Sequence, residues 1–76
     1  MDKALLEEMD AICVAIRKSG SDPYPQLYGY VTSGKIEYIT RTDNARERIK
    51  RLDIATVREY LSRLEDHYGT KIHQGE

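Results

Sequence analysis

The chain has 76 residues, with 12 lysines and arginines against 13 aspartates and glutamates, and a single cysteine. This length allows one domain, predicted over 1–76, and the single cysteine excludes an intramolecular disulfide. The formal net charge of −1 excludes a globally basic nucleic-acid binder, and no apolar run approaches the ~20 residues needed to span a bilayer. A domain of this size buries only about 60% of its unfolded surface, so self-association is an expected source of extra stability.

The first segment has the spacing of an amphipathic helix over about 3–19. Leu5, Met9, Ile12 and Ile16 recur at intervals of four, three and four residues, which places them on one face. Gly20 follows at the position of a C-terminal cap. The acidic start of the chain is not that of a signal peptide, and we expect a cytoplasmic protein.

A second helix is predicted over 23–33. Asp22 followed by Pro23 is a typical helix start, and Gly34 stands where the helix would end. Gly29 lies inside this helix, where glycine lowers stability by about 1 kcal/mol relative to alanine. We therefore expect another backbone to approach the helix closely at this position.

The alternation of side chains over 36–40 allows a short extended segment. One strand cannot form a sheet alone, so a strand here would need a twin from another subunit. The sequence therefore favours a connector anchored by Tyr38 and Ile39.

Two further helices are predicted, over 43–51 and 54–68. Thr42 or Asp43 is expected to cap the first of them, with Ala45 and Ile49 on its buried face. The second carries an apolar stripe formed by Ile54, Val57, Leu61, Leu64 and Tyr68. With 70–76 as a frayed tail, the prediction is a compact all-α fold of four short helices.

The middle of the chain reads PYPQLYGYVTSGKIEYITRTDNAR over 23–46. Its pattern resembles that of the IreB-like regulatory phosphoproteins of Gram-positive bacteria, most strongly over 12–52. The positions that match the family motif are Pro23, Gln26, Gly29, Tyr30, Ser33, Gly34, Tyr38, Ile39, Ala45 and Arg46.

The resemblance implies a non-enzymatic regulatory or adaptor protein that forms an intertwined or tightly packed homodimer. The founding member of this family is a substrate of a transmembrane Ser/Thr kinase that senses the cell wall, and it restrains cephalosporin resistance. The implied partners are a second copy of the chain and an unidentified protein, for which such a kinase is a candidate. Family members carry phosphothreonines ahead of the first helix, whereas the first threonine here is Thr32, so no phosphorylation site is transferred.

Apolar and aromatic residues of the middle segment are candidates for the dimer surface or for the core that supports it. These residues are Leu27, Tyr28, Tyr30, Val31, Tyr38 and Ile49. Tyrosine rings could also stack on nucleic-acid bases, but their amphipathic character favours a core or an interface.

The residues with catalytic or metal-binding potential favour structural roles. Cys13 borders an apolar stripe, which is typical of a packed, inert thiol rather than a nucleophile. His67 and His73, with Asp66, lack a further metal ligand at a suitable spacing and are expected to be exposed. We expect no metal, no cofactor and no enzymatic activity.

The segment 41–58 has six basic residues against three acidic ones, a net charge of +3. An alternative function is therefore nucleic-acid binding by the basic helix over 41–51, through Arg41, Arg46, Arg48, Lys50 and Arg51. The favoured interpretation is a solvated face with ion pairs such as that of Glu47 with Arg51. Arg46 is expected to contact a carboxylate or the carboxyl end of another helix.

Overall fold

The computed structural model describes residues 1–68, with side chains through residue 66. Within this range the fold is all-α, as predicted, and contains no strand. Its elements are α1 (Lys3–Lys18), α2 (Pro23–Ser33), η1 (Ile36–Tyr38), η2 (Thr42–Asn44), α3 (Ala45–Lys50) and α4 (Ile54–Tyr68), where η denotes a single 3-10 turn. The tail predicted over 70–76 lies outside the described residues.

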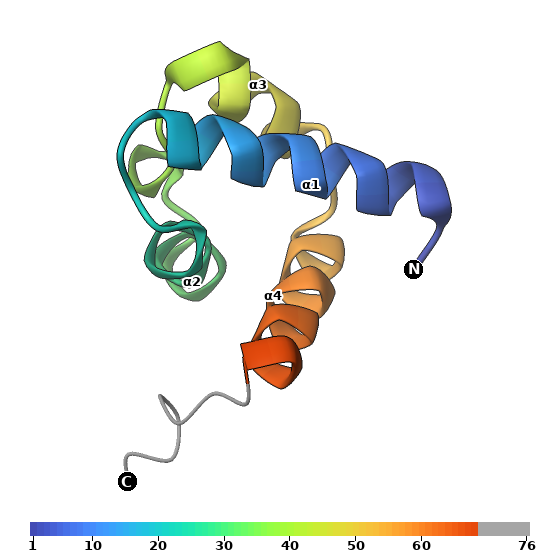
Figure 1. Ribbon diagram of the computed structural model, residues 1–76. Helices are drawn as coiled ribbons and strands as arrows, with labels where there is room; N and C mark the ends of the chain where they lie inside the picture. Colours follow the sequence, from blue (N-terminus) through green and yellow to red (C-terminus); the bar gives the residue numbers. More distant parts are fainter. Residues whose placement is uncertain (69–76) are drawn as a thin grey trace, which may run out of the picture.

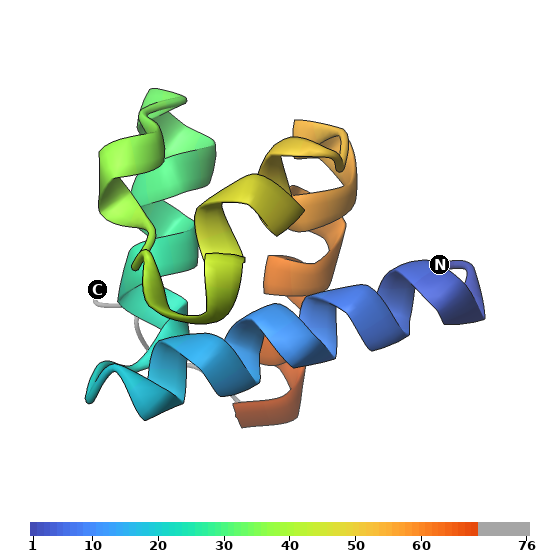
Figure 2. The ribbon, with the colours of Figure 1, turned by 90° about the horizontal axis from the view of Figure 1, so that it is seen from above.

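The long helix α1 crosses the molecule and contacts each of the other three helices (Figure 1). Helices α2 and α4 pack against each other on one side of α1, and α3 covers the other side. Seen from above, the connector that holds η1 and η2 lies beside α3 (Figure 2). The segment 23–46 thus forms one edge of the fold.

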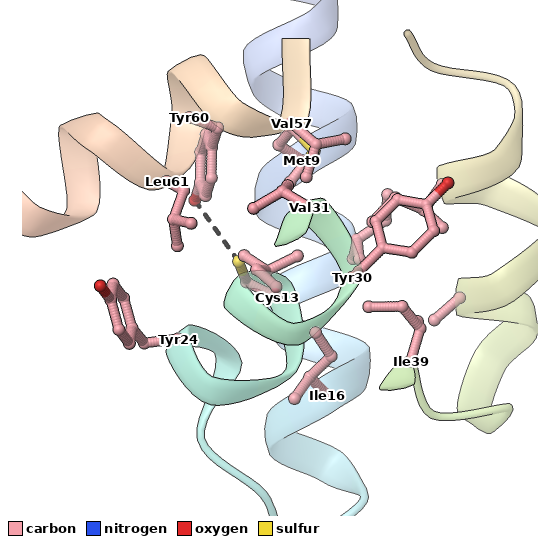
Figure 3. Close-up of a cluster of buried hydrophobic side chains, with 14 of the residues drawn as sticks. Met9, Cys13, Ile16, Tyr24, Tyr30, Val31, Ile39, Val57, Tyr60 and Leu61 are labelled. Atoms are coloured by element: carbon pink, nitrogen blue, oxygen red, sulfur yellow. Dashed lines mark hydrogen bonds between the residues drawn. The ribbon is translucent and has the colours of Figure 1, made fainter. Parts of the chain in front are cut away.

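The core forms where the apolar faces of these helices meet. Met9, Ile12 and Ile16 of α1 are fully buried, as their spacing predicts, whereas Leu5 is only half-buried. They join a cluster to which α2, α3, α4 and the connector contribute Leu27, Ile49, Val57 and Ile39 (Figure 3). Burial of one such side chain stabilises the fold by about 1.5–3 kcal/mol.

The ends of α1 and α2 follow the sequence signals. The Asp22 side chain accepts a hydrogen bond from the Tyr24 amide, 3.3 Å from Oδ1 to N. Gly20 and Gly34 have φ of +91° and +75°, the left-handed conformation that glycine adopts without strain. The helix boundaries predicted at these positions are correct to within one residue.

The connector and the start of α3 differ from the prediction. The possible extended segment over 36–40 is instead the η1 turn, closed by the Ile39 amide donating to the Ile36 carbonyl at 2.9 Å. Ile39, just beyond the turn, is extended, and its side chain is buried.

The third α-helix begins at Ala45, two residues later than predicted, and neither Thr42 nor Asp43 caps it through its side chain. Asp43 and Asn44 have φ of +50° and +62°, so the chain passes through the left-handed region twice before the helix starts. Aspartate and asparagine are the non-glycine residues that tolerate this conformation best. The backbone conformation of Asp43 and Asn44 therefore sets the direction in which α3 begins.

Candidate functional site

Helix α2 and the connector are in close contact at Gly29. A Cβ atom added there would lie 2.7 Å from Cγ and Cε1 of the Tyr38 ring, and closer still to its Cδ1. The predicted close approach is therefore present, but the group that approaches is an aromatic ring and not a backbone. The missing Cβ of Gly29 leaves the space that the Tyr38 ring occupies.

One turn of α2 away, Gln26 holds the next part of the connector. Its Oε1 accepts a hydrogen bond from the Thr40 amide at 2.9 Å. The hydroxyl of Thr40 in turn donates to Thr42 Oγ1 at 3.0 Å and accepts from the Thr42 amide at 3.2 Å. Between the turns η1 and η2, the backbone amides of Thr40 and Thr42 thus obtain their hydrogen-bond partners from side chains.

Arg46 holds the connector from the side of α3. Its Nε donates to the Ile39 carbonyl at 2.6 Å, and its Nη2 donates to the Glu37 carbonyl at 3.4 Å. These carbonyls lie at the carboxyl end of η1, so the expected contact of Arg46 with the carboxyl end of another helix is confirmed for a single 3-10 turn. We call the set Gln26, Gly29, Tyr38 and Arg46 the connector clamp.

The remaining motif residues shape the ends of this segment. The Ser33 hydroxyl donates to the Gly29 carbonyl at 2.7 Å and accepts from the Lys35 amide at 3.0 Å. Pro23, Tyr30, Ile39 and Ala45 are buried. The residues of the motif are thus brought together along one edge of the fold, where they fix α2, the connector and α3 relative to one another.

Two tyrosines are exposed to solvent at the clamp, one of them in it and one beside it. The side chain of Tyr38 is 49% exposed. Tyr28, which directly precedes Gly29 in α2, is 46% exposed. The Tyr28 ring stacks on Tyr24, with 5.9 Å between ring centroids. The hydroxyl of Tyr24 donates to Glu65 Oε2 at 2.7 Å, which ties this end of α2 to α4.

The six candidates for the dimer surface or its supporting core separate into two groups. Leu27 and Ile49 are fully buried in the single chain, and Tyr30 and Val31 are at most 9% exposed. These four can therefore only support an interface. Tyr28 and Tyr38 are the two that a partner could touch.

A chain of polar contacts that runs from the core to the surface joins α1 to α4, and the sequence pattern did not indicate it. The Cys13 thiol donates to Tyr60 Oη at 3.6 Å (Figure 3). The Tyr60 hydroxyl in turn donates to Asp10 Oδ1 at 2.7 Å. Burial raises the pKa of the Cys13 thiol above its usual range, with the hydrogen bond to Tyr60 opposing that shift. This position agrees with the predicted packed, inert thiol.

Three of the five basic residues of 41–51 make polar contacts within the chain, namely Arg46, Arg48 and Lys50. Arg48 forms a bidentate ion pair with Glu8, at 2.8 Å from Nε to Oε2 and 3.0 Å from Nη2 to Oε1. This contact with the guanidinium holds the pKa of the Glu8 carboxyl below its usual range, against the opposing effect of burial. The ion pair expected between Glu47 and Arg51 is not formed. Glu47 instead pairs with Lys50, at 3.7 Å between Oε2 and Nζ.

Together with the carbonyl contacts of Arg46, these pairs favour a structured face over a phosphate-binding stripe for nucleic acid. Among the described side chains, no group of three or more histidines, cysteines, aspartates or glutamates is placed to hold a metal ion. The side chain of His67 and the whole of His73 lie outside the described residues. Over the described range, no helix has the length and apolar character needed to cross a membrane.

The described residues form a small all-α protein, in which a motif of specific contacts fixes α2, the connector and α3 relative to one another. This class agrees with the comparison to known families. Residues 2–65 match the family of IreB regulatory phosphoproteins, and the chain belongs to that family. The protein is thus a regulator and not an enzyme. The match extends beyond 12–52, where the resemblance was strongest.

Proposed function

We propose that this protein is a homodimeric regulator that acts in the cytoplasm and is phosphorylated by a Ser/Thr kinase that senses the cell wall. The observation that carries the proposal is the family match over residues 2–65, which includes the whole connector clamp. Such a regulator would modulate the response to envelope stress, including resistance to cephalosporins.

The surface over the clamp supports self-association. Tyr28 and Tyr38 are large, amphipathic and about half exposed, and tyrosine is enriched at protein interfaces. Their backbones are fixed, because α2 is packed on α4 and η1 is held by Arg46. A preformed aromatic surface loses little conformational entropy when a second copy binds.

Sedimentation equilibrium tests the dimer. The wild-type chain is expected to be a dimer at tens of micromolar, and the double variant Tyr28→Ser with Tyr38→Ser is expected to be a monomer with an unchanged helical circular dichroism spectrum. Val14→Ser is the matched control, since Val14 is 52% exposed but lies on α1. A wild-type monomer at these concentrations, or a double variant that still dimerises, contradicts this part of the proposal.

Phosphorylation is tested by incubation with the host kinase and ATP, followed by mapping of phosphothreonine. Among the threonines that the structure describes, Thr32 is exposed, whereas Thr40, Thr42 and Thr56 are half-buried. Modification is therefore expected at Thr32 before the other three. Absence of phosphate from every threonine of the chain, including Thr70, contradicts the role as a kinase substrate.

A further inference from the structure

A surface pocket of about 370 Å³ is lined by residues of the connector and of α3. These two segments lie side by side in Figure 2. Its volume falls within the range of about 300–1,000 Å³ that is usual for small-ligand sites. The residues that line it are Ile36, Arg41, Asn44, Arg46, Glu47 and Lys50. The lining thus contains three cationic side chains and the Glu47 carboxylate, together with the half-buried side chain of Ile36.

The three cations are available to a ligand to different degrees. Within the part of the chain that the structure describes, the Arg41 side chain makes no ion pair or hydrogen bond. Lys50 is paired only loosely with Glu47, at 3.7 Å, and both side chains are more than half exposed. Exposed pairs of this kind contribute little to stability, so Lys50 can turn to a stronger anion at low cost.

Arg46 provides the fixed point of the pocket. Its guanidinium uses Nε and Nη2 to contact the Ile39 and Glu37 carbonyls, and Nη1 has no hydrogen-bond partner among the described residues. The side chain is therefore immobilised before any ligand arrives. A guanidinium held in this way binds an anion with little further loss of rotamer entropy.

The charge around the pocket favours a dianion. Three cations and Glu47 leave a formal charge of +2, which complements the charge of about −1.5 to −2 on a phosphate monoester at neutral pH. A phosphodiester carries a single negative charge, so its binding would leave a net positive charge in the pocket. We propose that this pocket binds a phosphate monoester, a role that does not depend on the dimer or on the kinase.

The same chemistry is offered by a phosphorylated threonine side chain and by free phosphate, so the test includes both. Three probes are titrated at constant ionic strength into the isotope-labelled protein: N-acetyl-phosphothreonine methylamide, inorganic phosphate and dimethyl phosphate. Amide chemical shifts of Asn44 and Glu47 report on the pocket. Saturable shifts with the phosphothreonine probe or with inorganic phosphate are expected, and dimethyl phosphate should bind at least about tenfold more weakly.

The relative affinities of the two monoesters then identify the source. Tighter binding of the capped phosphothreonine assigns the pocket to a phosphorylated polypeptide, and equal or weaker binding assigns it to free phosphate. The absence of saturable shifts at Asn44 and Glu47, or equal binding of dimethyl phosphate, overturns the proposal.

Charge-removing variants locate the site. Arg41→Gln and Lys50→Gln change exposed side chains and should each weaken monoester binding at least about fivefold while the fold is unchanged. Arg58→Gln is the matched control, because Arg58 belongs to the same basic segment but does not line the pocket. Equal losses in all three variants indicate general attraction to positive charge and contradict a site built from Arg41 and Lys50.

Discussion

Two regions of this small fold are stabilised in different ways. Where α1 meets α4, burial follows a repeating apolar stripe, with Met9, Ile12 and Val57 fully buried. Along the segment 23–46, burial is supplemented by individual contacts that no repeat encodes, such as those of Gln26 and Arg46. The first arrangement depends on hydrophobic volume in many positions, and the second depends on a few residue types in fixed places.

The difference explains why the family motif lies where it does. A stripe tolerates exchange of one aliphatic residue for another of similar volume. The clamp has no such freedom, because an amide oxygen, a missing Cβ and a guanidinium fork have no close substitutes. The same segment carries the two exposed tyrosines, so the contacts that hold it also hold the proposed binding surface.

The largest effect is expected in the stripe. Ile12→Ala should lower the free energy of unfolding by about 2–5 kcal/mol, because it removes a fully buried side chain and leaves a cavity. Chemical denaturation measures the loss. Ile12→Val, at about 0.5–1.5 kcal/mol, keeps the measurement possible if the alanine variant is unfolded. The exposed Val14→Ala on the same helix should change stability by no more than about 0.5 kcal/mol, and similar losses at both positions contradict the assigned faces of α1.

The next effect concerns a single hydrogen bond of the clamp. Gln26→Ala removes the acceptor of the Thr40 amide and should cost about 1–2 kcal/mol, with faster hydrogen exchange at that amide. Gln26→Glu keeps an acceptor oxygen at the same place and should retain most of the protection. An unchanged hydrogen-exchange rate at the Thr40 amide in the alanine variant would contradict a role of Gln26 in holding the connector.

The smallest effect is the loss of stability in alkali at the contact of α2 with α4. Burial, followed by the hydrogen bond to Glu65, raises the pKa of Tyr24 from 10.0 to about 12. The folded state thus keeps this proton where the unfolded chain releases it. The stabilisation is complete below pH 10.0 and is lost as the pH rises through about 12.

Denaturation at a series of alkaline pH values measures this slope. Tyr24→Phe should flatten it, and Glu65→Gln should flatten it in part, because the variant removes the negative charge beside the phenol. Burial raises the pKa of Tyr60 in the same direction, so a residual slope from the α1–α4 contact is expected in both variants. An identical slope in the wild type and in both variants contradicts the assignment.

The sequence was sufficient to predict the helices, because amphipathic spacing and the Asp22, Gly20 and Gly34 signals are local. It predicted a close approach at Gly29 but not the Tyr38 ring that makes it, since the partner of a helical glycine depends on tertiary packing. The 3-10 turn at 36–38 was missed, because alternating side chains suit a short extended segment as well as a tight turn. The buried Tyr60 lies beside the predicted stripe of α4 and is recognised only once Asp10 and Cys13 are placed next to it.

A double-mutant cycle between Gly29 and Tyr38 tests most directly whether the clamp determines the structure of this edge. Gly29→Ala should lower the free energy of unfolding by about 1–3 kcal/mol, since the added Cβ collides with the Tyr38 ring. In a Tyr38→Ala background the same change should instead stabilise the protein by about 0.5–1 kcal/mol, the intrinsic preference of a helix for alanine. Stabilisation by Gly29→Ala in both backgrounds would show that the two residues are not coupled, and would contradict the clamp.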